Sequence, residues 1–271
     1  MTLKTKMTMR IYLIAALLFL SFISSNRTLA TDPDTSFKIV PERKLSFVIV
    51  PYKPMMHLSD ADNDISRASD LSPQEIRTQL RLGLLKNLNT KLTLEYESKV
   101  VGQDYVENNE DDLSLIYNSL AFSEDTVFPL KANALPDSLK WKKNILASKE
   151  NTIKSKDKSY INVNFYDQLL LPDLARKHSA DYFIFLNELD IKTNFSDCLD
   201  LALKIYQREF KVHYSVFDRS GRQVYGDVAV MKFPSNSNDV NEIIAGNFPG
   251  ISDHIISSVK KVSATKAVAV R

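Results

Sequence analysis

Two carboxylates, Glu188 and Asp190, stand two positions apart on one apolar segment. Because alternate residues of a strand point to the same face, the spacing predicts two neighbouring acids. Such a pair could act as general acid and base or hold a cation. The commoner cause is a strand that leaves the core, and we favour that interpretation. A deep polar pocket where the pair meets a histidine would instead favour a catalytic or ligand-binding site.

The four histidines, His57, His178, His213 and His254, are widely scattered, and none has the close spacing of a helical or hairpin metal pair. A metal site would have to assemble in three dimensions, with His178 at a helix end and His213 on a hairpin as the best-placed ligands. The sequence has no Gly-x-Ser-x-Gly elbow, and its six glycines form no phosphate-binding loop. We therefore expect no metal, no cofactor and no catalytic residue.

The single cysteine, Cys198, could be a reactive thiol or the partner of an intermolecular disulfide. Its neighbours Asp197 and Asp200 would raise the pKa of the thiol, which disfavours a thiolate nucleophile. Free cysteines are commonly buried, so we expect a plain buried thiol.

A hairpin predicted for residues 208–233 offers a different kind of site. Apolar residues from Phe210 to Val216 alternate with polar ones, and Asp218-Arg219-Ser220-Gly221 supplies the turn. We expect an exposed polar face and an edge to which a partner strand could be added. Tyrosines near the hairpin could serve an interface, although cross-strand packing also explains them. The expected interaction surface comprises Lys211, His213, Tyr214, Arg222 and Tyr225.

Apolar periodicity predicts the elements that must position these residues. Short β-branched or alternating runs predict strands, whereas stripes with capping signals predict helices. The expected strands cover 45–51, 91–101, 161–165 and 180–191, followed by the hairpin strands. The expected helices cover 73–89, about 168–178, and a C-terminal stretch opening at Asp239, in which Pro249 kinks or restarts the helix. Residues 194–204 are expected to form a turn or a short helical piece.

This order of elements predicts an α/β fold: a mixed sheet with helices packed on it and an antiparallel C-terminal hairpin. We expect a single domain over 45–262 with an insertion at about 103–159, followed by a mobile tail at 263–271. The insertion has acidic residues between Asp104 and Asp112 and a run of lysines between Lys140 and Lys158. The two groups could pair, but two solvated loop faces are the simpler expectation.

Residues 1–30 have the order of a cleaved signal peptide: a basic start, an apolar run too short to span a bilayer, and small residues before a cut between Ala30 and Thr31. A flexible entry segment, 31–44, should follow. The net charge of +2 includes four basic residues and no acidic one within 1–30, so the remaining chain carries −2. This balance argues against a nucleic-acid-binding protein. We expect an exported protein, periplasmic or secreted, with no stable membrane anchor.

Two segments resemble a family of bacterial envelope proteins. The helix leading into Ser179-Ala180-Asp181-Tyr182 and an apolar strand is similar to a pattern in proteins with the fold of the TolB amino-terminal domain, CsgG and LpoB. Val216-Phe217-Asp218 turning through Gly221 resembles their hairpin, and Phe47 to Tyr52 resembles their first strand. The resemblance spans roughly 45–262 and implies a TolB-like fold and action by binding other proteins. This chain lacks the lipid-attachment cysteine and carries the 103–159 insertion, so no anchor or specific partner is implied.

Together these observations predict a non-enzymatic exported envelope protein that acts as a protein-interaction or assembly module, with an unidentified envelope protein as partner. The alternative is a hydrolase or small-ligand binder whose site lies between the insertion and the strand ends of the sheet. Glu188, Asp190, His178 and Cys198 are the polar candidates for that site.

Overall fold

Strand β1, Ser46–Val50, lies inside the main sheet, and all five of its residues are buried. The structure is a computed structural model that describes residues 43–102, 109–127 and 159–269. The expected signal peptide with its cut at Ala30 and Thr31, most of the entry segment, and the lysine run lie outside these residues. The elements described below all belong to one unit, Lys44–Arg271.

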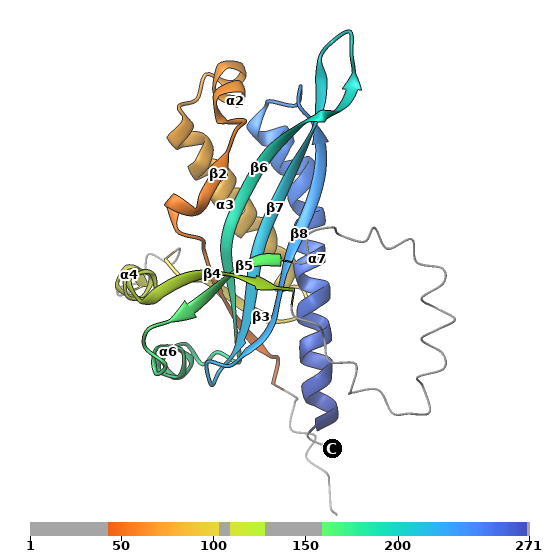
Figure 1. Ribbon diagram of the computed structural model, residues 1–271. Helices are drawn as coiled ribbons and strands as arrows, with labels where there is room; N and C mark the ends of the chain where they lie inside the picture. Colours follow the sequence, from red (N-terminus) through yellow and green to blue (C-terminus); the bar gives the residue numbers. More distant parts are fainter. Residues whose placement is uncertain (1–42, 103–108, 128–158, 270–271) are drawn as a thin grey trace, which may run out of the picture. The chain divides into compact units, whose positions relative to one another are not determined.

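The main sheet has the strand order β3-β1-β6-β7-β8, and β2 also pairs with β6 (Figure 1). The bounds of these strands are β2 His57–Ser59, β3 Glu97–Val100, β6 Tyr182–Asp200, β7 Ile205–Asp218 and β8 Gln223–Pro234. β1 runs parallel to β3 and β6, whereas β6, β7 and β8 are successively antiparallel. The predicted α/β fold with a mixed sheet and a C-terminal hairpin is therefore confirmed.

One face of the sheet is covered by helices α3, Pro73–Leu92, and α7, Val240–Ala269 (Figure 1). Phe47 and Ile49 of β1 belong to the core that these helices form with the sheet. α3 begins at the predicted capping box, in which Ser72 and Glu75 bond to each other's backbone N–H. The short helices η1, Pro54–Met56, and α2, Asp62–Ser69, precede α3.

The opposite face is covered by α4, Asn109–Ser119, by α6, Leu170–His178, and by a two-stranded sheet of β4, Leu120–Thr126, and β5, Ser159–Phe165. Val48 and Val50, which alternate with the residues above, share this second core with Ile116 and Leu120. The described parts of the predicted insertion therefore supply one layer of the fold, since they bury side chains against the sheet.

The strand predicted for 91–101 is wrong over its first half. α3 continues to Leu92 because this residue extends the buried stripe of Leu80, Leu84 and Leu88 by one more turn. Leu94 is exposed, and only Glu97–Val100 pairs with β1. The alternation of apolar and polar residues that predicted a strand from residue 91 therefore includes the last turn of α3.

Two further expectations are corrected at the C-terminal end of the chain. Residues 194–200 continue β6, and 205 begins β7, so the turn predicted for 194–204 is confined to 201–204 at the end of a long hairpin. α7 runs through Pro249 to Ala269 as one element, so residues 263–269 are helical where a mobile tail was predicted. The proline does not end the helix.

Candidate functional site

The β6–β7 hairpin extends beyond its neighbours, and we call residues 194–206 the hairpin tip. β2 accompanies β6 only as far as Ile191, and β8 pairs with β7 no further than Gln207. The tip therefore projects from the sheet (Figure 1). Its pairing is irregular, with register shifts between Asn194 and Cys198 and again before Asp200. Such bulges bend and twist a strand pair away from its sheet.

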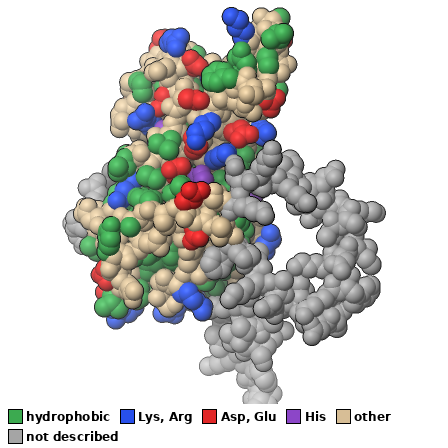
Figure 2. Space-filling view, in the orientation of Figure 1, with side chains coloured by type: hydrophobic (Ala, Val, Ile, Leu, Met, Phe, Trp, Pro, Cys, Tyr) green, Lys and Arg blue, Asp and Glu red, His purple; other side chains and the backbone are tan. Residues whose placement is uncertain are grey.

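Large apolar side chains are exposed on the hairpin tip. The exposed fractions are 70% for Phe195, 50% for Leu199, 83% for Leu201 and 70% for Leu203. Figure 2 shows hydrophobic side chains gathered on this projection. Phe195 contacts Tyr206 edge-to-face, with ring centroids 5.2 Å apart. Clustered exposed apolar residues of this kind mark interaction sites on soluble proteins.

Polar groups interrupt the apolar tip. Asp197 and Lys204 are exposed, and Asp200 accepts a hydrogen bond from the Leu203 N–H at 3.0 Å. Cys198 is exposed, so the predicted buried thiol is wrong. The reason is its place on the projecting part of β6, which none of the described layers covers.

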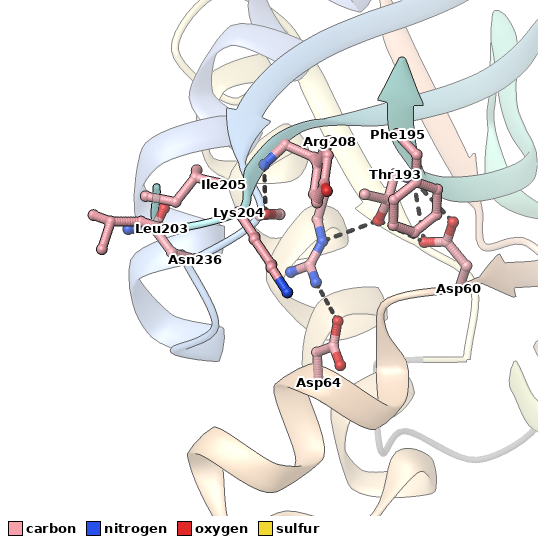
Figure 3. Close-up of a pocket in the computed structure, with 11 residues that line it drawn as sticks. Asp60, Asp64, Thr193, Phe195, Leu203, Lys204, Ile205, Arg208 and Asn236 are labelled. Atoms are coloured by element: carbon pink, nitrogen blue, oxygen red, sulfur yellow. Dashed lines mark hydrogen bonds and ion pairs between the residues drawn. The ribbon is translucent and has the colours of Figure 1, made fainter. Parts of the chain in front are cut away.

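The base of the hairpin tip is held by a buried arginine. Arg208 is 1% exposed, and it donates to Asp64 at 2.7 Å and to Thr193 Oγ1 at 3.2 Å (Figure 3). It also donates to Asn238 Oδ1 at 2.6 Å. Burial lowers the pKa of the guanidinium, and the Asp64 carboxylate opposes that shift. Asp60 accepts from the Thr193 N–H and hydroxyl. Arg208 and its partners thus tie both hairpin strands to α2 and to the start of α7.

A cavity of about 340 Å³ lies at this base, between the tip and α2. The acids that line it, Asp60 and Asp64, are already bonded to Thr193 and Arg208 (Figure 3). The rest of its wall includes tip side chains such as Phe195 and Leu203. The cavity is therefore a groove between the tip and α2 whose two acids already have partners.

A second, polar pocket of about 230 Å³ lies on the middle of the sheet, at the junction with β4 and β5. Glu188 and Asp190 line it, directly opposite His213 and Lys211 in the β6–β7 register. The structure thus brings together the predicted carboxylate pair and one of the candidate histidines. Figure 2 shows acidic and basic side chains gathered around a histidine on this face. The pocket is open on one side rather than deep.

The carboxylate of Glu188 is poorly compensated. Burial raises its pKa above the ordinary value of 4.5, and the negative charge of Asp190 raises it further. An acid with a raised folded-state pKa destabilises the fold when it ionises. This destabilisation is absent below the unfolded-state pKa, grows as the pH rises towards the folded-state pKa, and is complete above it.

We therefore expect Glu188→Gln to raise the free energy of unfolding by on the order of 1 kcal/mol at neutral pH, because it removes a buried charge without a hydrogen bond. The gain should shrink as the pH falls from the raised folded-state pKa towards the ordinary Glu value of 4.5, and it should be absent below that value. Urea unfolding at several pH values measures it. Glu97→Gln, at an exposed position of β3, is the control. A gain of equal size at every pH would contradict this electrostatic explanation.

The remaining predicted residues do not form one surface. Tyr214 and Tyr225 are 0% and 6% exposed and pack in the core, so they cannot serve an interface in this structure. Arg222 is exposed but lies in the β7–β8 turn, at the opposite end of β7 from the hairpin tip, where it pairs with Asp218. His213 is buried and Lys211 half-buried. The predicted polar face is therefore largely covered.

His178 lies apart from both sites, at the end of α6. Its Nε2 is 2.9 Å from Asp112 Oδ2, and Lys177 pairs with the same carboxylate at 2.7 Å. Burial and the nearby Lys99 lower the pKa of His178. These contacts attach α4 to α6, which is a structural role.

The apolar surface of the hairpin tip was not predicted from the sequence. A signal was present, because Phe195, Leu199, Leu201 and Leu203 share odd-numbered positions over nine residues. The aspartates between them favoured a turn, and the period of two was too broken to predict a strand.

No protein-family model matches this chain, and neither does any curated protein. Within the described ranges, no helix is long and apolar enough to cross a membrane. The same residues contain no group of three or more His, Cys, Asp or Glu side chains that could hold a metal ion.

Proposed function

We propose that this chain is a non-enzymatic exported protein that binds another protein of the cell envelope through its hairpin tip. The observation that carries the proposal is the set of four exposed apolar side chains on a projecting hairpin whose base is fixed by Arg208. The resemblance to envelope proteins that act by binding others supports it, as does the signal-like leader. The proposal includes a fold related to that of the TolB amino-terminal domain.

The apolar area is sufficient for recognition. Full burial of one large apolar side chain contributes about 1.5–3 kcal/mol, so four such residues can offset much of the entropy lost on association. The fixed base reduces that entropy loss, because the hairpin need not be ordered on binding. Asp197 and Asp200 lie between the apolar residues of the tip, and basic groups around the partner's groove would complement them.

A thiol-directed photo-crosslinker on Cys198 tests the proposal directly. This residue is the only cysteine in the chain, is exposed, and lies inside the apolar tip, so labelling requires no substitution. The labelled mature protein is added to an envelope extract of its own host and irradiated. We expect a defined crosslinked adduct that falls about tenfold when Phe195, Leu201 and Leu203 are all changed to Ser.

The matched control changes three equally exposed apolar residues elsewhere, Leu94, Tyr166 and Leu169, to Ser; these are 76%, 79% and 67% exposed. Neither triple variant should lose stability, because none of the six side chains is buried. An adduct that survives the tip substitutions, or that falls equally in both variants, would refute binding through the tip.

The alternative function, binding of a small ligand, is favoured by one specific observation. Glu188, Asp190 and His213 line one polar pocket, so the carboxylate pair meets a histidine as that alternative requires, although the pocket is open rather than deep. The chemistry of this second site is independent of the hairpin tip.

A further inference from the structure

We propose that the polar pocket binds a small organic monocation through a primary ammonium group, with Glu188 as its main carboxylate partner. The site is built on the main sheet, where a register shift between Leu186 and Glu188 interrupts β6. Such bulges re-aim the side chains that follow them. Glu188 and Asp190, two positions apart after the bulge, both line the pocket.

Glu188 lacks the partner that a buried carboxylate needs. Its side chain is 10% exposed and makes no hydrogen bond with the described residues. His213 Nε2 lies 3.8 Å from Oε1, beyond hydrogen-bond distance. A buried charge in this condition costs free energy until a cation or a donor reaches it.

His213 does not supply the missing positive charge. Its Nδ1 accepts a hydrogen bond from the Ile161 N–H at 3.0 Å, and only a ring nitrogen without a proton can accept. The ring is therefore neutral in this arrangement, with its proton on Nε2, on the side of Glu188.

Asp190 adds a second incomplete acceptor to the pocket. Its Oδ2 pairs with Lys192 Nζ at 2.8 Å, whereas its Oδ1 is buried without a hydrogen-bond partner. The side chain is only 6% exposed. An ammonium group has three donors, so one ligand atom can serve Glu188 and, directly or through a water, Asp190.

The described lining of the pocket is acidic on balance. Among these residues, carboxylates outnumber lysines by three to two. An acidic lining favours a positively charged ligand. The carboxylates are Glu124, Glu188 and Asp190, and the lysines are Lys192 and Lys211.

The remaining wall selects an organic cation over a metal ion. Tyr160, Val228 and Val230 contribute an aromatic ring and two aliphatic side chains. These groups suit the alkyl part of an amine, and a tyrosine ring also attracts a cation. A cavity of about 230 Å³ has room for several non-hydrogen atoms. No metal-holding cluster occurs at this pocket or elsewhere in the described residues.

The test is a calorimetric and NMR titration of the mature protein with n-butylammonium near pH 7.5. We expect saturable binding with a millimolar or lower dissociation constant and a shift of the His213 ring signals. Glu188→Gln should weaken binding about tenfold, because it replaces a charge-assisted hydrogen bond by a neutral one. Glu97→Gln, on exposed β3, should leave the affinity within about twofold of the original.

Four results can overturn the proposal. Equal binding of 1-butanol would show that the pocket takes the alkyl chain and ignores the charge. Displacement of the amine by equimolar K⁺ or Ca²⁺ would identify an inorganic cation site instead. If binding did not saturate at about 10 mM n-butylammonium, the pocket would not bind the amine with the expected affinity. If Glu188→Gln left the affinity unchanged, Glu188 would not be the partner of the ammonium group.

Discussion

Replacing Arg208 with alanine is expected to lower the free energy of unfolding by about 3 kcal/mol. The substitution removes a nearly fully buried guanidinium together with its hydrogen bonds to Asp64, Asn238 and Thr193. It also leaves a cavity where the arginine stem packed. Urea unfolding measures the loss. An unchanged m-value, the slope of the unfolding free energy against urea concentration, would show that the denatured state is unaffected.

Arg67→Ala provides a matched control on the same carboxylate. Arg67 pairs with Asp64 at 3.3 Å, but its side chain is 78% exposed. Exposed pairs contribute little, so we expect a change within about 0.5 kcal/mol. If the two arginine variants lost equal stability, burial would not be the reason for the importance of Arg208.

Gly226→Ala is expected to lower the free energy of unfolding by about 2 kcal/mol. A Cβ at this position of β8 would overlap the Tyr160 hydroxyl. Tyr160 is 1% exposed, and its hydroxyl accepts a hydrogen bond from Gln223 Nε2, so the ring cannot move aside freely. The substitution should therefore push β5 away from the main sheet. Thermal or urea unfolding tests the stability.

Gly246→Ala is the opposite case in the same protein. This exposed glycine lies within α7, and nothing lies within 4 Å of an added Cβ. Alanine favours a helix over glycine, so the free energy of unfolding should rise by about 0.5–1 kcal/mol. A stabilising Gly226→Ala would show that the contact with Tyr160 is not restrictive.

The sequence predicted the elements whose signals are local. β1 is a dense β-branched run, α3 opens with a capping box, and the β7–β8 turn contains Gly221 at a positive φ of 81°. These features depend on near neighbours in the chain. The α/β class followed from their order.

Other features depend on contacts that no local pattern contains. The end of α3 at Leu92 is decided by packing, and the extension of β6 to Asp200 is decided by pairing with β7. Arg208 bonds to Asp64, which is 144 positions away. Glu188 and Asp190 were predicted as a pair, but the approach of His213 and Tyr160 required the bulge and the docking of β5. The candidate sites were therefore predictable as residue types and not as assembled surfaces.

The aspartates of the hairpin tip have a consequence for solubility. An exposed apolar hairpin promotes aggregation unless charged residues interrupt it. Asp197, Asp200 and Lys204 give the tip a net charge of −1, so the tips of two copies repel each other at close range. Salt screens this repulsion over about 8–10 Å at physiological ionic strength, a distance that still covers direct contact. The same acids thus oppose self-association of the exposed apolar side chains of the tip.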